Sequence, residues 1–288
     1  MSFANLKKRN IADLQAKLKS TQQQYEKDDI WTIAVDKSGN GSAIIRFLPE
    51  AENNDTPYAL QYQHSFKYNG KWFIETCPTT AGKQFSDCYC CTKNNELWAT
   101  GLESNQKLVR DRKRKTNYFM NILVIKHPGR PEDEGKVFKY RCGTKIYEKI
   151  LEKINPDPTL GEEPFDPFDF YTGANFRLKA RNVNDQRNYD QSVFDSPSAL
   201  FGGDDTKLEE VYKQLNDLRK YSSNAPILSM AEMKAKYEKV CGGASTQSKS
   251  EDFDDFEDDI PPAPKRVASV TKQEDDDDEK LFEDLLDD

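Results

Sequence analysis

The sequence predicts a mainly β protein with peripheral helices (α+β), built on a small barrel of the OB type. Two observations favour this class. Runs rich in β-branched and aromatic residues alternate with turn signals from residue 31 to residue 183. Helical periodicity is concentrated later in the chain. A β-sandwich would show similar strands, so the pattern favours the barrel without excluding the sandwich.

The strands are predicted as hairpins joined by recognisable turns. Asn69-Gly70 is the strongest signal, because this dipeptide favours the tight turn that matches the twist of two strands. The sequence DKSGNG predicts a second hairpin turn, and Pro49 ends the strand that follows it. A longer loop, HPGRPEDEG, separates a third pair. The predicted strands are residues 31–35, 42–48, 58–68, 71–77, 118–126, 136–143 and 174–183.

Three helices are predicted around these strands, at residues 144–154, 206–221 and 229–240. Ser229 and Glu232 form a capping box at the start of the last one. Near the beginning of the chain, Ile11, Leu14 and Leu18 form a narrow apolar stripe on a short helix. Such a helix needs a surface on which to dock, because it is too short to be stable alone.

Charge divides the 288 residues into three parts. Residues 251–288 contain 17 acidic and 4 basic side chains, whereas the preceding 250 residues contain 38 basic and 33 acidic ones. We therefore predict a basic arm at 1–20, a core at 21–250 with a zinc subdomain at about 60–100, and a disordered acidic tail at 251–288. The chain shows neither a signal peptide nor an apolar run of about 18 residues, so we expect a soluble intracellular protein without membrane contact.

Apolar residues are clustered among the carboxylates at the end of the tail. They are Leu281, Phe282, Leu285 and Leu286. A purely solubilising tail would not require this clustering, so a segment that becomes helical on a protein partner is the favoured interpretation.

Four of the six cysteines are close together in the sequence. His64, Cys77, Cys88 and Cys91 offer three thiolates and an imidazole, a donor set typical of structural zinc, and Cys88 and Cys91 have the C-x-x-C spacing. Such a site would be closed and would act as a structural staple. The alternative is a group of free thiols packed beside a hairpin. Cys90 is placed outside the set, because the C-x-C spacing is less usual for metal ligands.

A basic run leads directly into an aromatic and apolar strand in RDRKRKTNYFMNILVIK, residues 110–126. Cations attract phosphates, and aromatic rings stack on unpaired bases. Aromatic residues are also frequent from Trp72 to Tyr189, more than a small core needs. The combination predicts binding of single-stranded nucleic acid without sequence readout, and a duplex would be bound less well because its base faces are hidden.

The chain resembles the single-stranded DNA-binding replication proteins of T-even-type bacteriophages. The resemblance rests on GNGSAIIRFLP, NGKWFIETC, the His64–Cys77–Cys88–Cys91 set, KRKTNYFMNILVIK, EGKVFKYRCGTKIY and GANFRLK. It implies an OB-fold core with one structural Zn²⁺, action in the cytoplasm of an infected bacterial host, and no enzymatic activity. It also implies self-association along DNA through Lys7, Lys8 and Arg9 of the arm. Replication and recombination proteins would bind the acidic tail.

The residues predicted to contact DNA come from the aromatic and basic segments together. They are Arg46, Trp72, Phe85, Trp98, Arg112, Lys113, Arg114, Lys115, Tyr118, Phe119, Lys139, Tyr140, Arg141 and Tyr189. Phe85, Trp98, Tyr118, Tyr140 and Tyr189 stand at or near positions where the resembled family has aromatic contacts. Because strand residues alternate, Lys139 and Arg141 are expected on one face and Tyr140 on the other.

Three other functions compete with this one. A zinc enzyme would need an open metal position, and the chain has two histidines and neither a G-x-S-x-G nor an H-E-x-x-H motif. A sequence-specific regulator would need a recognition helix beside the metal, where the sequence predicts strands and turns. Binding of single-stranded RNA is the closest alternative, because no residue pattern excludes a 2′-hydroxyl.

Overall fold

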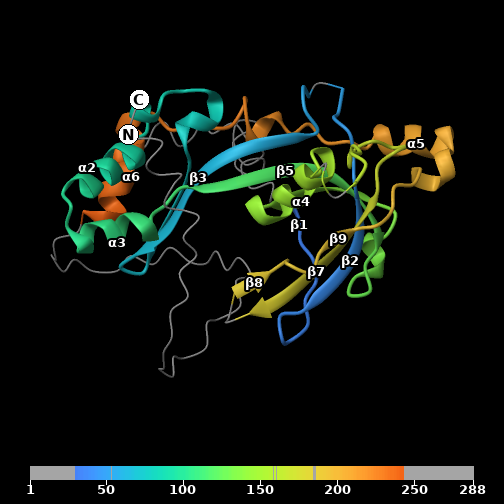
Figure 1. The fold of residues 1–288 in the computed structure, drawn as a ribbon. Helices are drawn as coiled ribbons and strands as arrows, with labels where there is room; N and C mark the ends of the chain where they lie inside the picture. The colour runs from blue at the N-terminus through green and yellow to red at the C-terminus, as the bar shows by residue number, and fades with distance from the viewer. Residues whose placement is uncertain (1–29, 53, 158, 160, 184–185, 243–288) are drawn as a thin grey trace, which may run out of the picture. The chain divides into compact units, whose positions relative to one another are not determined.

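The computed structural model describes residues 30–52, 54–157, 159, 161–183 and 186–242. The predicted arm and acidic tail lie outside these residues, and so do Lys7, Lys8, Arg9, Leu281, Phe282, Leu285 and Leu286. The described part is mainly β with several helices, as predicted (Figure 1). None of the helices in this part is both long and apolar enough to cross a membrane.

The strands form one nine-stranded sheet with the order β1-β6-β5-β2-β7-β8; β3 pairs with β4 and β5, and β9 pairs with β7. The strands are β1 (Ile30–Trp31), β2 (Gly41–Phe47), β3 (Tyr58–Tyr68), β4 (Lys71–Thr76), β5 (Lys115–Lys126), β6 (Val137–Cys142), β7 (Asn175–Val183), β8 (Gln186–Asn188) and β9 (Val193–Phe194). Among the described residues the two ends of this order are not paired, so the sheet is open and a closed barrel is not confirmed.

The strand β5 is the centre of the sheet. Its N-terminal part pairs with β3, its C-terminal part pairs with β2, and β6 pairs with its middle. Residues 119–124 are all buried, which fits the apolar run in the sequence. The main core lies on the side of Met120, Ile122 and Val124, where Phe47 and Phe176 pack against them. A second core, under the β3–β4 hairpin, contains Phe66, Phe73 and the four clustered cysteines.

The Asn69-Gly70 hairpin is confirmed. Both residues have positive φ, 47° and 81°, as the predicted turn requires. In contrast, the predicted hairpin of residues 31–35 with 42–48 is wrong. Asp36 caps the turn at residues 36–40, but β1 is short and pairs in parallel with β6 rather than with β2. The side chains of Trp31 and Ile33 enter the core there.

The helices follow the predicted order with two corrections. They are α2 (Tyr89–Ala99), α3 (Glu103–Asp111), α4 (Thr144–Ile154), α5 (Asp205–Tyr212) and α6 (Met230–Cys241), and the capping box of α6 is present. The predicted helix 206–221 ends early, because Tyr212 is followed by turns and a short 3₁₀ segment, Arg219–Tyr221. The metal region is not only strands and turns, since α2 and α3 lie there. In Figure 1, α2, α3 and α6 gather at one end of the long strands β3 and β5.

Candidate metal centre and nucleic-acid interface

The four predicted metal ligands meet at the end of the β3–β4 hairpin. His64 is on β3, Cys77 follows β4, and Cys88 and Cys91 lie at the start of α2. The hairpin register brings the first two together, because His64 is opposite Glu75 and the Cys77 amide donates to the Tyr62 carbonyl at 2.8 Å. All four side chains are buried, and their donor atoms lie within 4.8 Å of one another.

Three of the donor-atom separations are close to the edges of a tetrahedral zinc site. Sγ of Cys77 lies 3.7 Å from Sγ of Cys91, and Nε2 of His64 lies 3.2 Å from Sγ of Cys88 and 3.5 Å from Sγ of Cys91. With Zn–S near 2.3 Å and Zn–N near 2.0 Å, tetrahedral edges would be about 3.5–3.8 Å. The residues therefore fit one zinc ion with a closed set of four protein ligands, which is the structural type of site.

Electrostatics favours a cation among these sulfurs. Hydrogen bonds from Cys88 and Cys91 hold the pKa of the Cys77 thiol well below its usual value. The hydrogen bond with Cys77 raises the pKa of Cys88 to about 11. A buried anionic sulfur is costly without a positive partner, and a divalent metal supplies one. Cys90 is buried beside the cluster but is not part of the four-residue group, as predicted.

A row of aromatic side chains begins next to this centre. Cross-strand partners in an antiparallel pair project to the same face, and the register Leu60↔Tyr118 and Tyr62↔Thr116 puts Tyr62 and Tyr118 on one face. Arg114 lies over the Tyr62 ring, with Cζ 4.1 Å from the ring centroid, and 5.9 Å from that of Phe85. We call the following set the aromatic row: Phe85, Arg114, Tyr62, Tyr118, Tyr58 and Tyr147.

The far end of the aromatic row is a cluster of three tyrosines. Tyr118 stacks on Tyr147 of α4 with centroids 3.8 Å apart and planes 10° apart, and Tyr58 contacts both rings edge-on. Burial raises the pKa values of Tyr118 and Tyr147 above the usual value for tyrosine, so both phenols stay neutral. All three rings are half-buried, so part of each ring is accessible to a ligand. Neutral rings beside a guanidinium are suited to stack on bases and to neutralise a phosphate.

The sequence of the chain is similar to a known protein family. Residues 39–241 match the family described as gp32 DNA binding protein like. The chain belongs to this family. It is 42% identical over 217 residues to the single-stranded DNA-binding protein of Enterobacteria phage T4, which covers 74% of this chain and 70% of the relative. It is 40% identical over 247 residues to that of Enterobacteria phage T2, covering 83% and 80%.

In this member of the gp32-like family, two predicted DNA-contacting arginines are structural. Arg46 is fully buried, and its Nη2 donates to the carbonyls of Asp169 and Ser198 at 2.9 and 3.0 Å. Arg112 is 4% exposed and donates to the Tyr237 hydroxyl at 2.6 Å, with Tyr68 beneath it at 4.6 Å. The prediction that these two contact DNA is therefore wrong for this structure.

Two predicted aromatic contacts are also part of the core. Phe119 is 3% exposed and stacks on Tyr221 at 3.8 Å with parallel planes. Tyr140 is 4% exposed and packs edge-on against Trp31. Neither ring has a free face for a base, so both are corrected to core residues.

Four other predicted contacts lie on the opposite side of the sheet. Each of them pairs across from a residue on the face that the aromatic row does not use. The cross-strand pairs are Lys67↔Trp72, Gln63↔Lys115, Phe119↔Arg141 and Asn121↔Lys139, whereas the aromatic row uses the alternate residues of β3 and β5. We call Trp72, Lys115, Lys139 and Arg141, with Lys67, the reverse face. The predicted separation of Lys139 and Arg141 from Tyr140 is confirmed. The structure therefore does not bring these residues together with Tyr118 on one face, and their contact with DNA stays a prediction.

The remaining predicted contacts are near the surface. Trp98 on α2 is half-buried under Arg110, whose Cζ lies 5.4 Å from the ring centroid. Lys113 is half-buried between α3 and β5. Tyr189 is half-buried against the main core. Phe85, Arg114 and Tyr118 are the predicted contacts that the structure brings into the aromatic row.

The predicted contacts did not include Tyr58, Tyr62 or Tyr147. A signal for the first two exists in YALQYQH, because Tyr58 and Tyr62 are four residues apart and therefore share one face of the predicted strand. Tyr147 could have been found only with the packing of α4 against β5, which places its ring on Tyr118.

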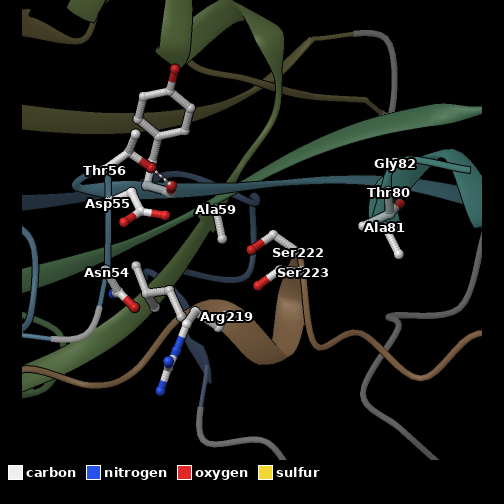
Figure 2. Close-up of a pocket in the computed structure, with 12 residues that line it drawn as sticks. Asn54, Asp55, Thr56, Ala59, Thr80, Ala81, Gly82, Arg219, Ser222 and Ser223 are labelled. Carbon is white, nitrogen blue, oxygen red and sulfur yellow. Dashed lines mark hydrogen bonds between the residues drawn. The ribbon is translucent and has the colours of Figure 1, made fainter.

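A polar hollow of about 350 Å³ lies near the start of β3 and has a different character (Figure 2). Tyr58 is the one aromatic residue among those lining it, and the others include Asn54, Asp55, Ser222 and Ser223. Its arginine, Arg219, is engaged by Asp217 through Nε at 3.0 Å and Nη2 at 2.5 Å. Without stacked rings or an uncommitted cation, this hollow is a poor candidate for nucleic acid.

Proposed function

We propose that this protein binds single-stranded DNA without sequence readout and coats it during viral DNA replication, recombination and repair. It would act as a binding protein and not as an enzyme. The relatives of Enterobacteria phages T4 and T2 are named single-stranded DNA-binding proteins. The observation that carries the proposal is the guanidinium of Arg114 over Tyr62 beside the half-buried Tyr118 stack.

The energetics of such a row favour single strands. Stacking contributes about 1–3 kcal/mol per base and requires that the base faces be exposed. Phosphate contacts on single strands add a salt dependence of about −0.7 per contact in log K against log salt. A duplex offers the phosphates without the base faces, so the protein destabilises duplexes by favouring the unpaired state.

The proposal is tested by titrating labelled oligo(dT), oligo(rU) and a DNA duplex of equal length with the full chain at two salt concentrations. The expected result is tight, salt-sensitive binding to oligo(dT) and much weaker binding to the duplex. Equal affinity for duplex and single strand would contradict the proposal. Preferential binding of oligo(rU) would make RNA the ligand.

We also propose that the sheet is part of an OB-type barrel. Because β5 pairs successively with β3, β6 and β2, it can serve as the bent strand of an OB-type barrel. An experimental structure that shows a flat open sheet would contradict this.

The His64–Cys77–Cys88–Cys91 group would hold one structural zinc. Metal analysis of the purified protein is expected to give one zinc per chain, and a stable metal-free protein would contradict the assignment.

The arm and the tail have separate proposed roles. Lys7, Lys8 and Arg9 would support self-association along DNA, so their replacement by alanine should lower cooperativity on long strands while sparing binding to a short oligonucleotide. Equal losses on both lengths would place the arm in the DNA site.

The acidic tail would recruit replication and recombination proteins through Leu281, Phe282, Leu285 and Leu286 and would compete with DNA. Deleting residues 251–288 should therefore tighten DNA binding, and weaker binding would contradict the competition. The site of action would be the cytoplasm of an infected bacterial host, which fractionation of infected cells can test.

A further inference from the structure

Arg114 contacts both the metal-ligand cluster and the aromatic row. Its Nη1 donates to Oγ1 of Thr79 at 3.0 Å and lies 3.9 Å from Sγ of Cys77. The same guanidinium covers the Tyr62 ring at 4.1 Å. One side chain therefore spans two sites that otherwise belong to different elements of the fold.

Thr79 completes the contact between them. Its hydroxyl donates to Sγ of Cys77 at 3.2 Å, and its oxygen accepts from Arg114. A hydroxyl has one proton to donate and lone pairs to accept with, so both contacts can exist together. The order of donation, from Arg114 to Thr79 to Cys77, ends on the sulfur, which is where negative charge resides. The hydrogen-bonded chain is therefore directed toward the metal-ligand cluster.

The charge of a loaded site strengthens this chain. Three thiolates and a neutral imidazole around a divalent ion leave one net negative charge, and outer hydrogen bonds to ligating sulfurs fix ligands in place. Arg114 contacts the cluster through Nη1, and a guanidinium carries five N–H donors in a planar fork. A phosphate can thus be bound by the rest of the fork while Nη1 stays on Thr79.

We propose that Arg114 is a positioning residue that couples the metal centre to DNA. In the loaded protein, Cys77 and Thr79 hold the guanidinium over Tyr62, in place for a phosphate. Because coupling between two sites is reciprocal, bound single-stranded DNA tightens the hold on the metal. The inference rests on the proposed DNA-binding function.

The test measures zinc affinity of the full-length protein by competition with a chromophoric chelator, with and without saturating oligo(dT). Saturation is established separately for each variant, so weaker DNA binding does not mimic lost coupling. For the unaltered protein, oligo(dT) is expected to raise zinc affinity by a factor within about 5–150. Arg114→Lys keeps the charge but loses the planar fork, and Thr79→Val removes the hydroxyl. In both variants, oligo(dT) is expected to change zinc affinity by a factor near one. Both variants should still bind zinc in the absence of DNA.

Lys107→Gln is the matched control, because it removes one exposed cation on α3 and should keep the full factor. An unaltered protein that binds oligo(dT) with no change in zinc affinity would overturn the coupling and leave the proposed function intact. The coupling would also be overturned if Arg114→Lys kept the full factor. Absence of oligo(dT) binding by the unaltered protein would instead overturn the proposed function itself.

Discussion

The two faces of the β3–β5 strand pair carry similar residue types in very different arrangements. On one face, Arg114, Tyr62 and Tyr118 belong to a row that also includes rings from α4 and the metal region. On the reverse face, the 47%-exposed Trp72 has Lys67 at 6.0 Å from its ring, and Phe119 is covered by Tyr221. Aromatic and basic residues on a strand therefore become a candidate binding surface only where the neighbouring elements extend it.

A second contrast separates the arginines of the basic run. Arg112 and Arg114 are two residues apart, and both lie over aromatic rings. Arg112 is enclosed by Phe66, Tyr68 and Tyr237, whereas Arg114 is half-buried between Thr79 and Tyr62. The first stabilises the packing of α6, and the second is available to a ligand.

The largest expected effect comes from removing the proposed zinc, because its candidate ligands lie at the Phe85 and Arg114 end of the row. A structural zinc contributes an apparent free energy of about 10–16 kcal/mol in small domains. Chelation at neutral pH should lower the unfolding temperature of the intact chain by on the order of ten degrees. It should also weaken DNA binding. Differential scanning calorimetry with and without chelator, followed by zinc restoration, measures this. An unchanged transition would contradict a structural role for the metal.

The next effect concerns the buried arginine. Arg112→Met should lower the free energy of unfolding by about 3 kcal/mol, because it removes a buried, charged hydrogen bond to the Tyr237 hydroxyl. Urea denaturation measures the loss. Arg141→Met on the exposed reverse face is the control and should change stability by less than about 0.5 kcal/mol. Similar values for the two variants would contradict the structural role of Arg112.

Sequence reasoning reached the parts of the fold that local chemistry determines. Asn69-Gly70 specified its turn, the helix at 144–154 was predicted with its observed ends, and the four residues of the candidate metal cluster were identified by residue type and spacing. It failed where tertiary contacts decide. Arg46 and Arg112 look like surface cations in the sequence, yet backbone carbonyls and three rings bury them.

The faces of the strands were harder to predict than the strands. Alternation separated Lys139 and Arg141 from Tyr140, but it could not show that Tyr221 covers Phe119. Nor could it reveal α2, whose weak apolar pattern is compensated by the burial of Cys90 and Cys91 and by α6 packing on α2.

A smaller effect distinguishes the charges of the two faces. Arg114→Gln should reduce the magnitude of the log–log salt slope of oligo(dT) binding by about 0.7, the value for one phosphate contact on a single strand. Arg141→Gln should leave the slope unchanged, because Arg141 pairs across from Phe119 on the reverse face. Fluorescence anisotropy at several salt concentrations measures both slopes. Equal reductions would mean that DNA contacts both faces.

The most direct test of the aromatic row compares Tyr118→Leu with Trp72→Leu in binding of a short oligo(dT) at fixed salt. Both variants replace a ring by an aliphatic chain, and thermal unfolding of each confirms that the fold is kept. The row predicts that Tyr118→Leu weakens binding by about 1–3 kcal/mol, roughly 5- to 150-fold, whereas Trp72→Leu changes it less than about twofold. A larger loss for Trp72→Leu would place the DNA on the reverse face and contradict the account.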